Sequence, residues 1–271
     1  MGFGERYSEG DMSVSDVEIR KAAGLLAAAN HVVVLTGAGV SKESGVPTFR
    51  DAMEGLWANF NPEELATPQA FRRNPQLVWD WYEMRRQKVD AVQPNPGHYA
   101  IARLEDRLPH VTVVTQNVDG LHRMAGSTDV IELHGNIRQH KCFDACQGEP
   151  TLIDLGSLRW AHADRPPRCP HCGAHVRPNV VWFGESLPAG AFSRAQQLAE
   201  TADVVLIVGT SGIVQPAASL PYYAKRLGHA QLIDVNPERD EIAPICDVFL
   251  QGPSGVILPQ VLAAVDALNK A

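Results

Sequence analysis

Short apolar runs alternate with longer amphipathic segments along most of the chain. The runs are rich in Val, Leu and Ile, which is typical of strands buried on both faces of a sheet. We predict strands at residues 32–35, 111–115, 130–133, 179–183, 203–208, 231–235 and 247–250. We predict helices at residues 15–29, 76–92, 98–108 and 256–268, the first opened by the capping box Ser15-x-x-Glu18. Strands that alternate with helices predict an α/β fold with a doubly wound parallel sheet.

Small or polar residues follow most of the predicted strands. These clusters lie at residues 37–39, 116–119, 134, 209–211 and 236–238. In an open parallel sheet, ligands bind outside the carboxyl ends of the strands, so the five clusters should line one cleft. Each cluster alone is more simply a turn. Five together favour a ligand site, because turns do not need so many Asn, Asp, Gln, His, Ser and Thr residues.

The turn after the first strand, Gly37-Ala38-Gly39, is typical of loops that hold a pyrophosphate. Residues without bulky side chains let the backbone turn tightly and present N–H groups to a ligand. The dinucleotide pattern would place a third glycine at position 42, where this chain has Lys42, so a plain tight turn is the alternative. The following hydroxyl groups, aromatic ring and cation suit a loop that folds over a charged cofactor. These residues are Ser41, Ser44, Phe49 and Arg50.

Composition and charge narrow the class of protein. The chain has 271 residues, 45% of them hydrophobic and 20% charged, as in a globular protein with one large domain or two unequal ones. Its net charge of −7 does not support nucleic-acid binding and suits basic partners such as lysine-bearing peptides. No apolar run approaches the ~20 residues of a membrane helix, and no basic region precedes an apolar core at the N-terminus. We expect a cytoplasmic protein without nucleic-acid or membrane partners.

Four of the five cysteines form a C-x3-C pair and a C-x2-C pair. The pairs are Cys142 with Cys146 and Cys169 with Cys172. Four soft thiolates in a tetrahedron suit Zn²⁺, and with all four positions filled by protein the ion would be structural. Two disulfides are the alternative, which a cytoplasmic location disfavours. His171 and His175 are nearby alternative ligands, but four thiols make them unnecessary. The sequence predicts one structural zinc ion.

Several longer stretches combine these features. They are Gly37-Ala-Gly-Val-Ser-Lys-Glu-Ser-Gly-Val-Pro-Thr-Phe-Arg50, Thr115-Gln-Asn-Val-Asp-Gly-Leu-His122, His134-Gly135, the paired cysteines, Val180-Val-Trp-Phe-Gly-Glu185 and Gly209-Thr-Ser211. Together, from about residue 32 to residue 250, they resemble the sirtuins, NAD-dependent protein-lysine deacylases. The resemblance implies a Rossmann-like NAD-binding domain, with a smaller domain made of a helical module and a zinc ribbon. We expect a monomer. The large domain would comprise residues 1–50, 94–137 and 178–271, and the small one residues 51–93 and 138–177.

The sirtuin resemblance implies NAD as co-substrate and indicates where it binds. The glycine turn and Ser211 would hold the pyrophosphate, and Asn117 and Asp119 the nicotinamide end. Asn236 and Glu238 would lie at the adenosine ribose. The predicted cofactor-binding residues are Gly37, Ala38, Gly39, Ser41, Phe49, Arg50, Trp57, Gln116, Asn117, Val118, Asp119, Gly209, Thr210, Ser211, Asn236, Pro237, Glu238 and Cys246.

The resemblance also implies a catalytic role for His134. An imidazole titrates near neutrality, so it can act as general base on the ribose hydroxyl that attacks the acyl carbon. His122 is the rival, but it lies further into its loop, where a helix is expected to start. The products would be free lysine, nicotinamide and O-acyl-ADP-ribose.

Two residues of the helix predicted at residues 76–92, Tyr82 and Arg85, indicate which acyl groups the protein would remove. They are three positions apart, so their side chains extend from the same face of the helix. The pair resembles the Tyr-x-x-Arg of class III sirtuins, which prefer succinyl and malonyl groups, and Ala66 matches the small residue of their acyl pocket. A guanidinium and a phenol can together bind a carboxylate. A merely solvated Arg-rich helix face is the alternative. The resemblance further implies that an acyl-lysine protein or peptide pairs as a strand with residues 181–185. The predicted substrate-binding residues are Ala66, Tyr82, Arg85, Val181, Phe183 and Gly184.

Two other functions are compatible with these motifs. An NAD-dependent mono-ADP-ribosyltransferase on the same scaffold would leave labelled protein instead of acyl-ADP-ribose. A zinc-ribbon adaptor with a vestigial nucleotide fold would release no nicotinamide, and the presence of His134, Asn117 and Asp119 disfavours it.

Overall fold

A computed structural model describes residues 15–46, 65–188 and 190–270 of the chain. Six strands form one parallel sheet in the order β3-β2-β1-β6-β7-β8. Their bounds are β1 (His31–Thr36), β2 (His110–Thr115), β3 (Val130–Glu132), β6 (Val204–Val208), β7 (Gln231–Asn236) and β8 (Val248–Gln251). The order reverses between β1 and β6, which makes this the switch point of the sheet. The predicted doubly wound α/β fold is confirmed.

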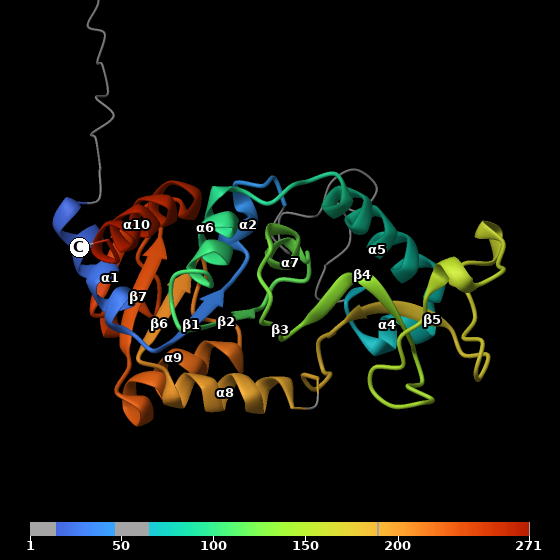
Figure 1. Cartoon of the computed structure of the whole chain (residues 1–271). Helices are drawn as coiled ribbons and strands as arrows, with labels where there is room; N and C mark the ends of the chain where they lie inside the picture. Colours follow the sequence, from blue (N-terminus) through green and yellow to red (C-terminus); the bar gives the residue numbers. More distant parts are fainter. Residues whose placement is uncertain (1–14, 47–64, 189, 271) are drawn as a thin grey trace, which may run out of the picture.

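Helices cover both faces of this sheet (Figure 1). One face carries α1 (Asp16–Ala28), α6 (Pro96–Leu104) and α10 (Ser254–Leu268), and the other carries α8 (Ala191–Thr201) and α9 (Leu220–Tyr223). Val32 and Val34 of β1 pack in the core under the first group, and Val33 and Leu35 in the core under the second. Because both faces are covered, the strand is apolar throughout instead of alternating.

The predicted capping box at the start of α1 is met only in part, because Glu18 contacts the Ser15 hydroxyl instead of the Ser15 backbone N–H. Ser15 is the N-cap, its Oγ accepts a hydrogen bond from Glu18 N (3.3 Å), and the same hydroxyl donates to Glu18 Oε2 (3.2 Å). Two further short helices, α2 (Gly39–Lys42) and α7 (Leu121–Ala125), follow the carboxyl ends of β1 and β2. The chain also makes short 3₁₀ or π turns at Leu155–Ser157, His162–Asp164, Ala217–Ser219, Ala224–Gly228 and Ala243–Ile245.

A smaller part of the molecule lies beside the large sheet (Figure 1). It contains α4 (Pro68–Arg73), α5 (Pro75–Asp90) and the antiparallel pair β4 (Gly135–Cys142) and β5 (Val176–Val180). It has its own apolar cores, separate from those of the large sheet. The predicted domain boundaries at 137/138 and 177/178 fall inside β4 and β5, so these strands run from one predicted domain into the other. The division into domains remains a prediction.

The structure differs from the prediction in two segments. The strand expected at residues 179–183 is β5, which ends at Val180 and belongs to the small antiparallel sheet. Beyond it, the chain turns at Gly184, whose φ is +84°. The second difference is α4, which lies before the helix predicted at residues 76–92 and was not predicted; Thr67 caps it and Pro68 occupies its first turn, where proline is tolerated. Across the described residues, no helix combines the length and apolar character needed to cross a bilayer.

Candidate active site and metal site

The strand-end clusters are joined by hydrogen bonds at the carboxyl edge of the sheet. Asn117 Nδ2 donates to Gly37 O (3.0 Å), and Gln116 Nε2 donates to Thr210 Oγ1 (3.1 Å). Asn236 Nδ2 donates to Thr210 O (2.9 Å). Residues far apart in the chain therefore line one site. The predicted convergence is confirmed.

The glycines of this site allow two loops to touch. A Cβ added to Gly37 or Gly39 would lie 2.9 or 2.7 Å from Gly209 O, and one added to Gly209 would lie 2.4 Å from Val40 N. Gly209 also has a φ of +57°, a left-handed conformation that favours glycine. The N–H groups of Gly37 and Gly39 donate to Val208 O (3.1 Å) and Gly209 O (2.8 Å). The small residues thus serve packing between the β1 and β6 loops, and two of the turn's N–H groups are already used.

Ser41 lies at the centre of a buried polar network. Its Oγ donates to Asp119 Oδ2 (2.8 Å) and accepts from Asn117 Nδ2 (3.1 Å). Asp119 Oδ1 accepts from Leu121 N (2.9 Å), and burial raises the pKa of the Asp119 carboxyl. The network holds an amide, a carboxyl and a hydroxyl group in fixed positions, which suits recognition of sugar hydroxyls and a carboxamide.

His98 belongs to the same network and was not predicted as a site residue. Its Nδ1 accepts from Asn95 N (3.3 Å), which leaves Nε2 to donate to Ser41 Oγ (3.3 Å). Burial lowers the pKa of His98 to about 4, so the ring is neutral at physiological pH. In the sequence, His98 stands only as the third residue after a helix N-cap, a position that gives no sign of function.

His134 lies in the connection between β3 and β4. Its Nδ1 is 2.9 Å from Gln116 O, and because a carbonyl oxygen only accepts, Nδ1 carries the proton. Nε2 is then left with a lone pair. Burial lowers the pKa of His134, although the Gln116 carbonyl opposes this shift. The ring is therefore neutral and able to act as a base at neutral pH.

The rival histidine, His122, is buried and packed against other side chains. It lies in α7, as its predicted place at a helix start suggests, and its side chain is buried. Its Nε2 is 3.0 Å from Thr36 Oγ1, and its ring packs against His98 with centroids 4.9 Å apart. Burial lowers the pKa of His122 to about 3. Because the His122 ring is buried and its Nε2 has a protein partner, His134 is the better candidate for the base.

The remaining predicted cofactor residues differ in exposure and contacts. Ser211, Pro237 and Glu238 are exposed after β6 and β7, and Val118 O accepts from Ile137 N (2.8 Å). Cys246 is half-buried, its thiol donates to Ile242 O (3.4 Å), and burial raises its pKa to about 12. Ala38 is the N-cap of α2. Phe49, Arg50 and Trp57 lie outside the described residues.

The predicted acyl-pocket residues meet in the core of the smaller part. Tyr82 and Ala66 belong to one apolar cluster, and burial raises the Tyr82 pKa, so the phenol keeps its proton. The Arg85 guanidinium carbon lies 5.7 Å from the Tyr82 ring centroid and 4.8 Å from that of Trp81. Burial lowers the pKa of Arg85, which still leaves a cation at neutral pH. The structure thus places a cation and a phenol side by side.

The segment after β5 joins this pocket to the histidine. Val181 N donates to His134 O (2.9 Å), and Phe183 N donates to Ala66 O (2.9 Å). Phe183 is 50% exposed, and Gly184 adopts a positive φ. The exposed apolar residues Ile213 and Val214, which sequence reasoning missed, follow the Gly209 turn.

The four paired cysteines form the predicted metal cluster. All four Sγ atoms lie within 4.8 Å of one another, with Cys142–Cys172 at 3.5 Å and Cys146–Cys169 at 3.8 Å. A tetrahedron with Zn–S bonds of about 2.3 Å has edges of about 3.8 Å, so the four thiols fit one structural Zn²⁺. These separations are far longer than a disulfide bond of about 2.0 Å. The zinc interpretation is favoured over two disulfides.

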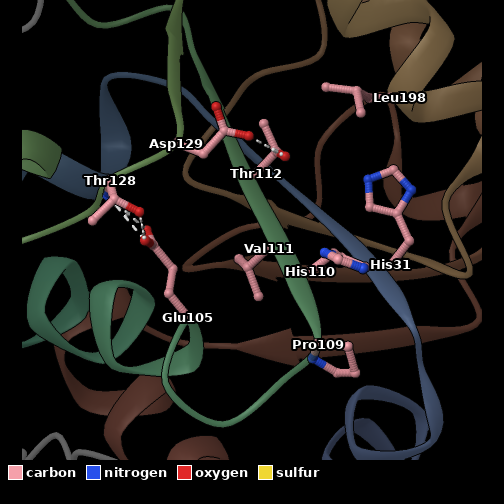
Figure 2. A pocket seen from close by; sticks show the side chains of 9 residues that line it. All are labelled: His31, Glu105, Pro109, His110, Val111, Thr112, Thr128, Asp129 and Leu198. Atoms are coloured by element: carbon pink, nitrogen blue, oxygen red, sulfur yellow. Dashed lines mark hydrogen bonds between the residues drawn. The ribbon is translucent and has the colours of Figure 1, made fainter.

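A separate hollow lies at the opposite edge of the sheet, where β1 and β2 begin (Figure 2). It has a volume of about 580 Å³. Its carboxylates are engaged by neighbouring hydroxyls, Glu105 by Thr128 (2.6 Å) and Asp129 by Thr112 (2.7 Å). None of the predicted site residues lines it. The candidate active site is therefore the carboxyl edge.

Comparison with known proteins identifies the family. Residues 37–216, more than half of the chain, match the Sir2 family. The chain belongs to the Sir2 family, as its sirtuin-like motifs predicted.

Individual relatives extend this similarity over nearly the whole chain. An NAD-dependent protein deacylase from Ralstonia nicotianae is 56% identical over 236 residues, 87% of this chain and 92% of the relative. The crystal structure of a Sir2 homolog–NAD complex matches with a TM-score of 0.83 and 42% identity, covering 94% of this chain and 96% of the other. Sir2Af2 bound to a myristoylated histone peptide matches with a TM-score of 0.73 and 39% identity, covering 94% and 99%.

Proposed function

We propose that this chain, an NAD-dependent protein deacylase of the Sir2 family, removes succinyl and malonyl groups from lysine side chains, and acetyl groups as well. The observation that carries this proposal is the pairing of Tyr82 and Arg85 on one face of α5, beside the small side chain of Ala66. A partly desolvated guanidinium attracts a carboxylate more strongly than one in water, and the adjacent phenol adds a donor.

The carboxyl-edge residues fit the chemistry of NAD. When bound, NAD supplies the ADP-ribosyl group that accepts the acyl group, with loss of nicotinamide. Asn117 and Asp119 would orient the nicotinamide ribose and carboxamide, and Asn236 would contact the adenosine ribose. The backbone N–H groups of Gly37 and Gly39 already donate hydrogen bonds to Val208 O and Gly209 O. The N–H groups of Ala38 and Ser211 are therefore the stronger candidates for binding the pyrophosphate.

His134 is the proposed general base. Its Nδ1–H bond to Gln116 O orients the ring and leaves the Nε2 lone pair to accept a proton from a ribose hydroxyl. The resulting products would be free lysine, nicotinamide and O-acyl-ADP-ribose.

The acyl-lysine peptide would lie against residues 181–184. The N–H groups of Val181 and Phe183 are used by His134 O and Ala66 O. An added strand would therefore pair with the N–H of Gly184 and with carbonyls of this segment. This placement brings the modified lysine between His134, on one side, and Tyr82 and Arg85 on the other.

The deciding experiment compares kcat/KM for acetyl-lysine and succinyl-lysine versions of one peptide. Arg85→Met should lower the succinyl-to-acetyl ratio of kcat/KM by about 10- to 100-fold, since a charge-assisted bidentate contact is worth roughly 1.5–3 kcal/mol. Arg73→Met, which removes an exposed arginine of the neighbouring helix α4, is the control and should leave the ratio unchanged. Equal losses on both peptides in Arg85→Met would refute the acidic-acyl pocket.

A further inference from the structure

Trp182 makes a direct hydrogen bond to the phenol of the proposed acyl pocket. Its indole Nε1–H donates to Tyr82 Oη at 2.9 Å, and both side chains are at most 2% exposed. The two residues are 100 positions apart in the sequence. Within the described part of the chain, this is the one hydrogen bond of the Tyr82 hydroxyl. An indole can only donate, so the phenol oxygen is the acceptor and its own proton is left for another partner.

The indole itself is held rigidly. The Arg177 guanidinium carbon lies 3.2 Å from the centroid of the Trp182 ring, and Arg177 pairs with Glu185. The Glu185 Oε2 atom also accepts from Trp182 N (2.8 Å), and the Phe71 ring lies 5.3 Å from the indole. Backbone, ring face and indole N–H of Trp182 are thus each held by a neighbour. Such a side chain can impose a direction on the group to which it donates.

A phenol that accepts one hydrogen bond has less rotational freedom, and its O–H becomes a better donor. The phenol stays protonated at neutral pH because burial raises its pKa. Arg85 lies on the same helix face as Tyr82, so a carboxylate that reaches the guanidinium also meets the phenol.

We propose that Trp182 determines acyl specificity by setting the direction of the Tyr82 hydroxyl, so that the phenol donates its proton to the carboxylate of an acidic acyl chain. Trp182 is a positioning residue in this scheme, because it acts through Tyr82. The inference rests on the proposed acidic-acyl function. It adds that residues from two segments, α5 and the segment after β5, together set the acyl specificity of the pocket.

The test measures kcat and KM on acetyl and succinyl peptides for Trp182→Phe, Tyr82→Phe and the double variant. Trp182→Phe should lower the succinyl-to-acetyl ratio of kcat/KM about tenfold, mainly through a higher KM for the succinyl peptide. The double variant should show the same ratio as Tyr82→Phe alone, because the indole N–H has no hydroxyl left to direct.

The chain offers a matched control in Trp79. This residue is also buried in the smaller part, but its Nε1 has no hydrogen-bond partner among the described residues. Trp79→Phe removes the same atoms beside the cysteine cluster and no hydrogen bond to Tyr82, so any loss of activity should fall equally on both peptides and leave the ratio unchanged. If Trp182→Phe lowers both activities in proportion, as a packing defect does, the inference is overturned. It is also overturned if the effects of Trp182→Phe and Tyr82→Phe on the ratio simply add.

Arg85→Met separates this inference from the function on which it rests. If Arg85→Met lowers the ratio and Trp182→Phe does not, the acidic-acyl function stands and the role of Trp182 falls. If Arg85→Met leaves the ratio unchanged, both fall. Should Trp182→Phe fail to fold, Trp182 can be replaced by benzothienylalanine, which has sulfur in place of the N–H at nearly the same shape. The same loss of ratio is then expected, and an unchanged ratio would overturn the inference.

Discussion

His134 illustrates how a single hydrogen bond sets the chemistry of a residue. Its bond to Gln116 O places the proton on Nδ1, and burial keeps the ring neutral. His98 and His122 are also neutral, but both ring nitrogens of His98 and Nε2 of His122 have protein partners, and both rings are buried. The three histidines therefore differ less in protonation than in which nitrogen can reach a substrate.

Replacing His134 should remove the proposed general base. His134→Ala is expected to lower kcat on the order of 10²-fold or more, while the fold persists, because the ring is only partly buried. The measurement is steady-state release of nicotinamide with a saturating acyl-peptide. His110→Ala, an exposed histidine at the opposite edge of the sheet, should retain full turnover. Near-wild-type kcat in His134→Ala would remove this residue from the mechanism.

Asp234 in β7 should make stability depend on pH. Its carboxyl is fully buried, neither oxygen has a partner among the described residues, and burial raises its pKa from 3.8 to about 7. Between these values the folded protein keeps a proton that the unfolded chain loses. The free energy of unfolding should therefore fall with rising pH across this window, by about 1.4 kcal/mol per pH unit from this group.

Asp234→Asn removes that dependence. Denaturant unfolding of wild type and variant at pH 5 and pH 7.5 is the measurement, because contributions from other groups cancel in the difference. The variant should gain stability relative to wild type at the higher pH. An identical pH dependence in the two proteins would contradict the raised pKa.

At the scale of elements, the site depends on how two loops pack. The β1 and β6 loops touch through Gly37, Gly39 and Gly209 at distances that no larger residue allows. The polar side chains that follow these strands keep their positions only while the backbones stay in contact. The two glycines of the turn after β1 therefore pack against a third glycine, Gly209, which follows β6.

Gly209→Ala should disrupt this contact. The left-handed backbone alone costs about 1–2 kcal/mol, and the 2.4 Å approach to Val40 N adds to it. We expect a lower Tm and weaker NAD binding, measured by thermal unfolding with and without NAD. Gly24→Ala in α1, where the added Cβ meets nothing within 4 Å, should instead stabilise by about 0.5–1 kcal/mol. Equal Tm shifts in the two variants would argue against loop packing as the reason for Gly209.

At the scale of the whole molecule, the large sheet and the smaller part have separate hydrophobic cores. The large sheet has cores on both faces, and the smaller part is held by separate cores. One of these contains Cys142 and Cys169 together with Trp79 of α5, so the metal cluster is packed directly against the helix that bears Tyr82 and Arg85. A zinc ion held by these cysteines would therefore support the proposed acyl pocket without taking part in the chemistry.

Removing zinc should disable the smaller part first. Chelation, or Cys172→Ser, should abolish activity while most of the parallel sheet persists, since structural zinc sites supply folding energy locally. Zinc content, far-UV circular dichroism and turnover are the measurements, with one zinc per chain expected in wild type. Cys246→Ser, outside the cluster, should keep its zinc. Full activity in a zinc-free protein would contradict this role.

The amino-acid sequence by itself determined the six strands of the parallel sheet, the cysteine cluster and the strand-end positions of His134, Asn117 and Asp119, but not β4. These are local consequences of periodicity, spacing and topology, because apolar runs must be covered on both faces and parallel strands share one carboxyl edge.

Only the tertiary structure decided that Gly37 and Gly39 pack on Gly209, that His98 joins the Ser41 network and that Trp182 donates to Tyr82. The structure also showed that the strand predicted at residues 179–183 is β5 (Val176–Val180), which pairs antiparallel with β4. These features depend on pairs of groups that meet across long stretches of chain. No pattern of neighbouring residues contains that information, because the direction of one side chain toward another is set by the packing of everything around them.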